Sequence, residues 1–350
     1  MTLRQGLLVL SLTLFGTALA GCDLSGTTGG SDAPSVTGVY VANQGNFGDG
    51  NGSVTVYDPS TEQLRPQAVS GLGSIVQGIA VRDTTLLVMA NSAARIDVFS
   101  TDGPTQTGQV TGVTGPRYAA FPDPKTAYVT DQSFTGSSAV RVLDLSGASP
   151  RVVSTIPVSG SPEGIAVTDD RAYAALGAFG DTSLVAAIDV TRNALEDEID
   201  VGCTPRDVAA DGSGDVFALC SDAAKAVVLE GGTGAIQTRL SLPDTAETVF
   251  GVGDPASYAA AAEELYVATD SGVIRIDTRS DAVDALLDVG LSAAPGAVAY
   301  DAAREALYVA RAPGFTQRGT VTIHDRGGTQ TASFPAGIAP TAIDFRQAQP

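Results

Sequence analysis

The 350-residue chain has one histidine, no tryptophan, three cysteines and two methionines. With a single histidine, the sequence holds no Ser-His-Asp set, no Cys-His pair and no His-based metal cluster. His324 takes the position that Tyr57 and Leu143 hold in other repeats of the chain, so we interpret it as a strand residue rather than a general base. We predict no catalytic residue, no cofactor and no metal site from these residue types.

Basic residues are also scarce. The formal net charge is −19, from 20 Lys and Arg against 39 Asp and Glu. The lysines are Lys125 and Lys225, and neither lies in a basic run. Because binding to a phosphate backbone needs clustered Lys and Arg, we exclude nucleic acid as a partner. An acid-rich surface is typical of a strongly solvated setting and does not identify a substrate.

One strand pattern recurs along the chain, and residues 39–58 show it first. This stretch has an apolar strand, a polar glycine-rich loop and a second, alternating strand. Copies of the first strand are Leu86–Asn91, Thr126–Gln132, Arg171–Gly177, Asp215–Ser221, Leu265–Asp270 and Leu307–Ala312. No long segment has apolar residues at helical spacing, so the repeat is built from strands.

Each repeat opens with a short segment, in most cases Pro-x-x-apolar, that sets the period. The starts are Val76, Pro116, Pro162, Pro205, Pro255, Pro295 and Pro340, which lie 40 to 50 residues apart. This interval is typical of one four-stranded propeller blade. In the repeat that starts at Pro162 the expected strands are Gly164–Thr168, Ala172–Leu176, Leu184–Val190 and Glu198–Val201.

The two ends of the chain complete the blade count. Residues 340–350 are too few for a repeat, whereas Thr37–Gly71 contains three strands and lacks an opening one. Joined with Thr341–Phe345, Thr37–Gly71 makes one more blade, which gives seven. The predicted fold is all-β, a seven-bladed β-propeller of four-stranded antiparallel blades. Pairing of the C-terminal strand with the N-terminal blade would close it and remove the exposed sheet edge.

Two recurring positions have structural explanations. An aromatic residue recurs on the second strand of most repeats, which predicts packing between blades; the members are Tyr40, Tyr128, Tyr173, Phe217, Tyr266 and Tyr308. An acidic residue closes the third strand of most repeats, as in Asp58-Pro-Ser-Thr, where a carboxylate can accept a backbone N–H of the turn. A ring of metal-binding carboxylates is the alternative for these acids.

The first 22 residues have the pattern of an export signal. Arg4 supplies the positive charge, Gly6–Ala20 the short apolar core, and Leu-Ala-Gly-Cys22 a lipobox. We predict a lipoprotein signal peptide over residues 1–21, a flexible linker over 22–35 anchored by a lipid on Cys22, and the propeller over 36–350. The protein would then be exported and held at the outer membrane. An ordinary signal peptide with a chance cysteine is the alternative.

Cys203 and Cys220 are the other two cysteines. An exported protein meets an oxidising compartment, where pairing of cysteines is the default. Cys203 precedes one strand of its repeat and Cys220 ends the next, so a hairpin would bring both to the same edge. We predict a disulfide, with two unpaired buried cysteines as the alternative.

Candidate binding residues cluster on one predicted face, which carries the loops after the second strands and the connections between blades. Each long loop on this face holds a phenylalanine that does not follow the alternating pattern of buried strand residues. These are Phe47, Phe134, Phe179 and Phe315, and Phe250 lies in an inter-blade connection. These rings either pin their loops or form an apolar platform for a ligand. Polar candidates at the repeat starts are Arg117, Tyr118, Glu163, Arg206 and Asp207. The two arginines stand out because basic residues are rare, although each could pair with a neighbouring acid.

The strands of type YVAN, YVTD and YVAT, each followed by V-x-V-x-D, resemble the YVTN-type seven-bladed propeller repeats of exported bacterial proteins. In the first blade, Asn43, Gln44, Asn46 and Phe47 belong to the segment NQGNFG. It resembles the start of propeller lipoproteins that accompany TonB-dependent outer-membrane transporters, with Gln44 in place of the usual acid. The resemblance implies surface capture of cobalamin or a similar large nutrient for such a transporter.

Three classes of function follow from this reading. We expect a lipid-anchored, non-enzymatic propeller that binds a small-molecule ligand or a partner protein on its loop face. An enzyme of the lactonase-like or quinoprotein-like type is the alternative, because propellers host many activities. A scaffold for envelope assembly is a third.

Overall fold

A computed structural model describes residues 33–133, 136–180, 182–243, 256–259, 262–269, 272–284, 287–290 and 295–348. The chain divides into two compact units, Met1–Gly30 and Ser31–Pro350, and the first lies outside the described residues. Within the described part, no helix has the length and apolar character needed to cross a membrane.

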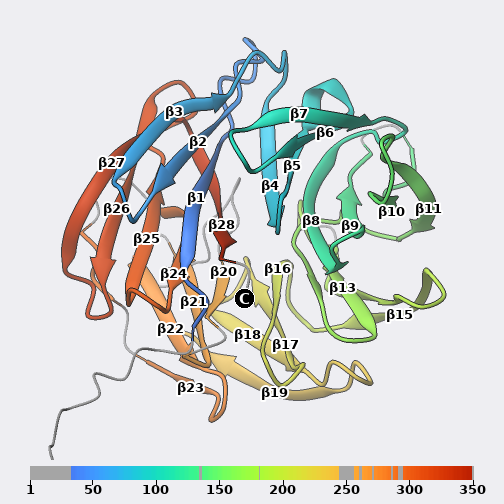
Figure 1. Ribbon diagram of the computed structural model, residues 1–350. Helices are drawn as coiled ribbons and strands as arrows, with labels where there is room; N and C mark the ends of the chain where they lie inside the picture. Colours follow the sequence, from blue (N-terminus) through green and yellow to red (C-terminus); the bar gives the residue numbers. More distant parts are fainter. Residues whose placement is uncertain are drawn as a thin grey trace, which may run out of the picture. The chain divides into compact units, whose positions relative to one another are not determined.

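The second unit consists of seven four-stranded antiparallel sheets, here called blades 1 to 7 (Figure 1). Blade 1 contains β28 (Pro340–Gln347), β1 (Val36–Asn43), β2 (Ser53–Asp58) and β3 (Gln63–Val69). Blade 2 contains β4 (Val76–Arg82), β5 (Thr85–Ala90), β6 (Arg95–Ser100) and β7 (Thr105–Val110), with the short 3-10 helix η1 (Asn91–Ala93) after β5. Blade 3 contains β8 (Pro116–Asp123), β9 (Thr126–Asp131), β10 (Ala139–Asp144) and β11 (Arg151–Pro157).

The remaining four blades follow in the same order. Blade 4 contains β12 (Ile165–Val167), β13 (Arg171–Ala175), β14 (Leu184–Asp189) and β15 (Ala194–Asp200). Blade 5 contains β16 (Pro205–Ala210), β17 (Val216–Cys220), β18 (Lys225–Leu229) and β19 (Ile236–Ser241). Blade 6 contains β20 (Ala256–Ala259), β21 (Glu264–Thr269), β22 (Gly272–Asp277) and β23 (Ala282–Val283). Blade 7 contains β24 (Pro295–Asp301), β25 (Ala306–Arg311), β26 (Arg318–Asp325) and β27 (Gln330–Ile338).

The blades close into a ring, as the sequence predicts. The last strand, β28, pairs with β1 in the register Val39↔Phe345 and Val41↔Ile343. The seven first strands contact one another in the cyclic order β28, β4, β8, β12, β16, β20, β24 and back to β28, and they surround the centre of Figure 1. The predicted fold class, the blade count and the closure are therefore confirmed.

One predicted strand boundary is wrong. The outer strand of blade 4 was expected over Glu198–Val201, and β15 spans Ala194–Asp200. Its first residues include the charged run Glu196-Asp197-Glu198, which is partly or fully exposed because the outer strand faces solvent on its free edge. Charged residues on an edge strand also discourage pairing with other chains.

The aromatic residues on the second strands hold adjacent blades together. Tyr40, Tyr128 and Tyr173 are at most 1% exposed. The Tyr40 hydroxyl donates a hydrogen bond to the Thr101 carbonyl in the next blade at 2.9 Å, and the Tyr173 hydroxyl donates to Gly231 at 2.7 Å. A buried tyrosine hydroxyl needs such a partner. These residues serve packing between blades, as predicted.

The acids that end the third strands make the predicted turns. Asp58, Asp144 and Asp189 each accept a backbone N–H from the residue two positions later, at 2.7 to 3.0 Å. Hydrogen bonds from neighbouring side chains and backbone groups lower the pKa of all three carboxyls. Their role in the structure is therefore local turn formation.

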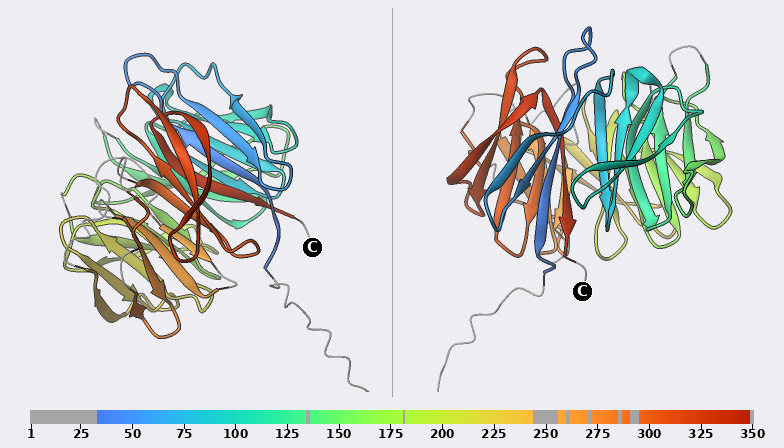
Figure 2. Two further views of the ribbon diagram at one scale, coloured as in Figure 1. Left: turned by 90° about the vertical axis from the view of Figure 1, so that its left-hand side faces the viewer. Right: turned by 45° about the horizontal axis from the view of Figure 1, so that its top comes forward.

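Two opposite faces result from the up-and-down strand order. The loops after the second strands lie beside the starts of the next blades: Gly177 N–H bonds to Pro205 O at 3.1 Å and Gln132 Nε2 donates to Pro162 O at 3.3 Å. We call this side the loop face. The start of β1 and the end of β28, which pair in the register Val36↔Gln347, lie on the opposite face, away from the loop of residues 44–52 that follows β1 (Figure 2, right).

One inner-strand position differs in the closing blade. The fifth residue of each repeat is alanine in six cases, namely Ala80, Ala120, Ala166, Ala209, Ala259 and Ala299, whereas blade 1 has Asp344. The Asp344 carboxylate accepts hydrogen bonds from Val81 N–H of blade 2 at 2.6 Å and from Phe345 N–H at 2.7 Å. Burial raises the pKa of this carboxyl to about 6. Asp344 thus ties the closing blade to its neighbour.

Candidate functional site

The second residues of three consecutive repeats meet on the loop face. Arg117 follows the first proline of blade 3, Glu163 that of blade 4, and Arg206 that of blade 5. Arg117 contacts the Glu163 carboxylate through two nitrogens, with Nε at 2.6 Å from Oε2, and Arg206 Nη2 donates to Oε1 at 2.8 Å. The Glu163 carboxylate therefore bridges the guanidinium groups of two residues that lie 89 positions apart in the sequence.

The cluster is buried and further hydrogen-bonded. Glu163 is 1% exposed and the Arg206 side chain 5%. Gln132, at the end of β9, donates its amide N–H to Glu163 Oε2 at 3.1 Å and to Pro162 O at 3.3 Å. Burial alone would lower the pKa of Arg117, but the adjacent Glu163 charge raises it above its usual value. Both arginines remain charged beside one carboxylate, so the cluster has a net positive charge.

Arg117 retains a donor for a ligand. Its Nε and Nη2 are used on Glu163, and no described residue accepts a hydrogen bond from Nη1. The Arg117 side chain is 11% exposed, which makes it the most accessible member of the cluster. A guanidinium N–H without an acceptor in the protein can bind a carbonyl oxygen, a carboxylate or a developing oxyanion.

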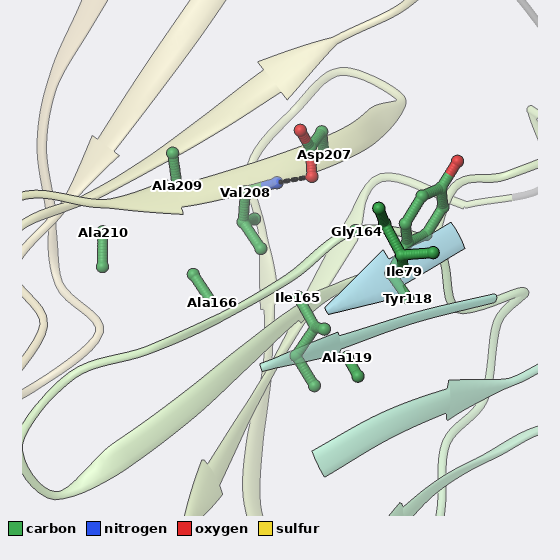
Figure 3. A pocket seen from close by; sticks show the side chains of 10 residues that line it. All are labelled: Ile79, Tyr118, Ala119, Gly164, Ile165, Ala166, Asp207, Val208, Ala209 and Ala210. Carbon is green, nitrogen blue, oxygen red and sulfur yellow. Dashed lines mark hydrogen bonds between the residues drawn. The ribbon is translucent and has the colours of Figure 1, made fainter. Parts of the chain in front are cut away.

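A cavity begins one residue further along the same strands. It has a volume of about 210 Å³ and is lined by Ile79, Tyr118, Ala119, Gly164, Ile165, Ala166, Asp207, Val208, Ala209 and Ala210 (Figure 3). These residues come from β4, β8, β16 and the segment that leads into and includes β12. Each of these strands is the first of its sheet, so one backbone edge is not paired within that sheet and can offer N–H and C=O groups to a ligand.

Asp207 is the carboxylate of this cavity. The residue is 5% exposed, and its Oδ1 accepts a hydrogen bond from Val208 N–H at 2.9 Å. The close approach depends on Gly164, because a Cβ atom there would lie 1.7 Å from Asp207 Oδ1. Tyr118 lies across the cavity, with its hydroxyl 3.5 Å from Gln77 Nε2. The site thus combines a carboxylate, a phenol and, next to them, two guanidinium groups.

The structure places the other predicted residues as follows. Phe47, Phe179 and Phe315 are on the loop face and are 76%, 60% and 54% exposed, so they do not pack into the core. Phe134 and Phe250 lie outside the described residues.

Asn43 and Asn46, two of the first-blade candidates, use side-chain hydrogen-bonding groups within the protein. The Asn43 amide is fully buried, donates to Thr55 Oγ1 at 3.0 Å and accepts from Gly337 N–H at 2.7 Å. Asn46 accepts from Gly48 N–H at 3.0 Å within its loop. Gln44 is 8% exposed, and its side-chain oxygen has no hydrogen-bond partner among the described residues.

Cys203 and Cys220 are joined by a disulfide with a Cα–Cα distance of 5.8 Å. Cys203 precedes β16 and Cys220 ends β17, and these strands pair in the register Pro205↔Cys220. The bond therefore lies at the loop-face end of blade 5, two residues from Pro205. Cys22 lies outside the described residues, and its lipidation stays a prediction.

Sequence reasoning missed Gln132 and Gln77. Gln77 could have been found, because it fills the repeat position that Arg117, Glu163 and Arg206 occupy. Gln132 follows a strand and gave no signal, since only the three-dimensional contact with Glu163 shows its place in the site.

His324 is a buried strand residue, as predicted. Its Nε2 lies 2.8 Å from Thr322 Oγ1 and its Nδ1 2.9 Å from Gly328 O. Burial lowers the pKa of His324, which favours the neutral ring. Across the described part of the chain, no group of three or more His, Cys, Asp or Glu side chains is arranged to hold a metal ion.

The sequence matches no protein-family model and no curated protein. Solved structures share the fold. The periplasmic gluconolactonase of Pseudomonas aeruginosa is similar with a TM-score of 0.70 at 15% identity, covering 89% of this chain and 100% of that one. A putative 6-phosphogluconolactonase of Bacteroides fragilis has a TM-score of 0.68 at 13% identity, covering 89% and 98%. A functionally unknown protein of Desulfotomaculum acetoxidans has a TM-score of 0.72 at 12% identity, covering 89% and 100%.

These comparisons correct the expected function. The sequence predicted a non-enzymatic binding protein, in its most specific form one that captures cobalamin for a transporter. Several of the similar structures are instead described as lactonases, including a second putative 6-phosphogluconolactonase, from Bacteroides uniformis. The first-blade segment NQGNFG misled the prediction, because in this structure Asn43 and Asn46 satisfy local hydrogen bonds. These descriptions agree better with the lactonase alternative than with the binding-protein hypothesis.

Proposed function

We propose that this protein hydrolyses small polyhydroxylated lactones in the cavity between the first strands of blades 2 to 5. The observation that carries the proposal is that Arg117, Glu163 and Arg206, joined in one ion-pair cluster, each immediately precede a residue that lines the cavity, namely Tyr118, Gly164 and Asp207. The fold-level similarity to gluconolactonases supports the reaction class. The cavity, of about 210 Å³, lies below the roughly 300 to 1,000 Å³ of drug-sized ligand pockets, which favours a small substrate over a macrocycle.

Each group has a role that its surroundings favour. Asp207 is the general base: it takes a proton from water as the water oxygen bonds to the lactone carbonyl carbon. Arg117 stabilises the oxyanion on the former carbonyl oxygen through its available Nη1. The ring C–O bond then breaks, and the proton held by Asp207 passes to the departing alkoxide. The product is an open-chain hydroxy acid, which releases one proton to solvent at neutral pH.

Glu163 and Arg206 position Arg117. Because Glu163 accepts hydrogen bonds from both guanidinium groups and from Gln132, its carboxylate is engaged within the cluster and is poorly placed to act as the base. Its charge fixes the orientation of the Arg117 guanidinium, which lowers the reorganisation needed in the transition state.

The experiment measures acid release from D-glucono-1,5-lactone with a pH indicator, after subtraction of spontaneous hydrolysis. We expect Asp207→Asn to lower kcat by about 10² to 10⁴-fold, the usual contribution of a general base. The matched control is Asp169→Asn, an exposed acid in the loop after β12 on the opposite face, which should retain full activity. Wild-type protein that fails to accelerate the hydrolysis of this and other simple lactones would refute the proposal.

We further propose that the enzyme is exported and lipid-anchored through Cys22. The lipobox and the Cys203–Cys220 disulfide support an oxidising compartment. Expression of the full chain with labelled palmitate should label wild-type protein and leave Cys22→Ala unlabelled and released from membranes. Equal labelling of both proteins would contradict the anchor.

A further inference from the structure

Among the third residues of the seven repeats, only Tyr118 is aromatic. The other repeats have Gly78, Gly164, Asp207, Ser257, Ala297 and Ala342 at this position. Packing between blades therefore does not require a large ring here, in contrast to the second-strand aromatics, which recur in most repeats. Tyr118 and Asp207 are the members of this set with a titratable side chain, and both line the cavity.

Gly164 separates the phenol from the carboxylate. Tyr118, Gly164 and Asp207 are the third residues of the repeats that form blades 3, 4 and 5, and all three line the cavity (Figure 3). Gly164 brings no side chain into the space between its two neighbours. A small ring bound over Gly164 would therefore have the Asp207 carboxylate on one side and the Tyr118 phenol on the other.

The position of Tyr118 is fixed by its surroundings. Its N–H donates to Thr130 Oγ1 at 3.1 Å, and the Thr130 hydroxyl donates to Glu163 O at 2.7 Å. Gly78 of blade 2 makes room for the ring, because a Cβ atom there would lie 2.9 Å from it. The Gln77 amide donates to the phenol oxygen at 3.5 Å. The phenol is thus held in place before a substrate binds, as efficient catalysis requires.

The charges around Tyr118 favour the loss of its proton to a ligand. Arg117 precedes it in the sequence, and the two side chains interact electrostatically. A guanidinium group beside a phenol stabilises the phenolate that remains once the proton has left. The Gln77 N–H points at the same oxygen and stabilises the same negative charge.

We propose that Tyr118 is a further catalytic residue, the general acid that protonates the departing alkoxide of the lactone. This inference rests on the proposed lactonase function and assigns the route of one proton. As the ring C–O bond breaks, the phenolic proton moves to the former ring oxygen and leaves a phenolate. The proton that Asp207 took from the attacking water then passes through a second water molecule to the phenolate. Both side chains return to their starting states, and the net reaction consumes one lactone and one water.

The test uses two lactones that differ in the group they release. D-glucono-1,5-lactone releases an alkoxide, which needs a proton, whereas dihydrocoumarin releases a phenolate, which is stable without one. Tyr118→Phe removes a single oxygen atom and should lower kcat about 100-fold for the sugar lactone and less than about threefold for dihydrocoumarin. The matched control is Tyr57→Phe, because Tyr57 lies on β2 with its ring stacked on Phe334 at 4.4 Å and does not line the cavity. It should retain the wild-type kcat for both lactones.

A purely structural role for Tyr118 predicts the same loss with both lactones, because a displaced ring misplaces either substrate. That result, or an unchanged kcat for the sugar lactone, would overturn the inference, while hydrolysis by wild type would still uphold the lactonase function. Wild type that hydrolyses neither lactone would refute both. Titration calorimetry with 1,5-anhydro-D-glucitol, a polyhydroxylated ring without a scissile bond, should give the same affinity for wild type and Tyr118→Phe. Weaker binding by the variant would assign the hydroxyl to substrate binding and contradict its role as an acid.

Discussion

The carboxyl of Asp344 should make the stability of the ring depend on pH in an unusual direction. Its pKa is about 6 in the folded protein, against 3.8 for an ordinary aspartate. A group whose folded pKa is raised binds its proton more tightly in the native state. Protonation of Asp344 therefore makes its full contribution to the stability of the folded protein below pH 3.8, and this contribution is lost as the pH rises through 6.

The magnitude follows from the shift. A difference of about 2 pKa units corresponds to about 3 kcal/mol, which is the most that ionisation of Asp344 costs the native state above pH 7. The side chain is enclosed by β28 and β4, while the residue as a whole is only half-buried. Partial exposure of the residue to solvent therefore moderates the effect, and we expect about 2 kcal/mol.

Asp344→Asn isolates this group from the other carboxyls. Asparagine can still accept the hydrogen bond from Val81 N–H and has no charge to desolvate. The free energy of unfolding of the variant minus that of wild type should rise by about 2 kcal/mol between pH 4 and pH 8. Urea denaturation followed by far-UV circular dichroism measures it, because the protein has no tryptophan to report unfolding.

Asp344→Ala serves as the second variant, since alanine is the residue of the other six repeats. It also removes the bond to Val81, so it should have the same pH slope as Asp344→Asn with a lower stability throughout. A difference that stays flat with pH, or that falls as the pH rises, would refute the assignment of a raised pKa to Asp344.

Three further variants test the site and the strands that support it. Replacing both Cys203 and Cys220 with alanine should lower the free energy of unfolding by about 3 kcal/mol, and an unchanged urea midpoint would exclude a stabilising disulfide. Glu163→Gln leaves two buried guanidinium groups without their carboxylate and should cost about 3 to 5 kcal/mol, so a loss below 1 kcal/mol would argue against a buried ion pair. Gly164→Ala should displace the Asp207 carboxylate and lower kcat/KM for lactone hydrolysis at least about 100-fold, with an unchanged circular dichroism spectrum. Full activity of this variant would show that Asp207 takes no part in catalysis.

The fold could be predicted from the sequence because its period is visible in single residues. The repeat starts recur every 40 to 50 residues, and the C-terminal segment supplies the one strand that the N-terminal blade lacks. Strand ends were less predictable where charge obscured the pattern, as in β15, because an outer edge strand tolerates charged residues that an inner strand excludes.

The site could be predicted in part. Arg117 and Arg206 stood out because basic residues are rare in this chain, and Glu163 was a polar candidate at a repeat start. Their common ion-pair cluster could not be predicted, since pairing of each arginine with any nearby acid was equally consistent with the sequence. The contribution of Gln132 depends on contacts across two blades, which no local pattern records.

The position of the two ends of the propeller matters for any use of the protein outside the cell. Val36 and Gln347, at the start of β1 and the end of β28, lie side by side on the face opposite the loop face. A fusion partner, an affinity tag or a chemical linker placed after Gln347 would therefore leave the loop face open to solution. A second linker in place of the residues before Val36 would hold the immobilised ring through two paired strands of its closing blade.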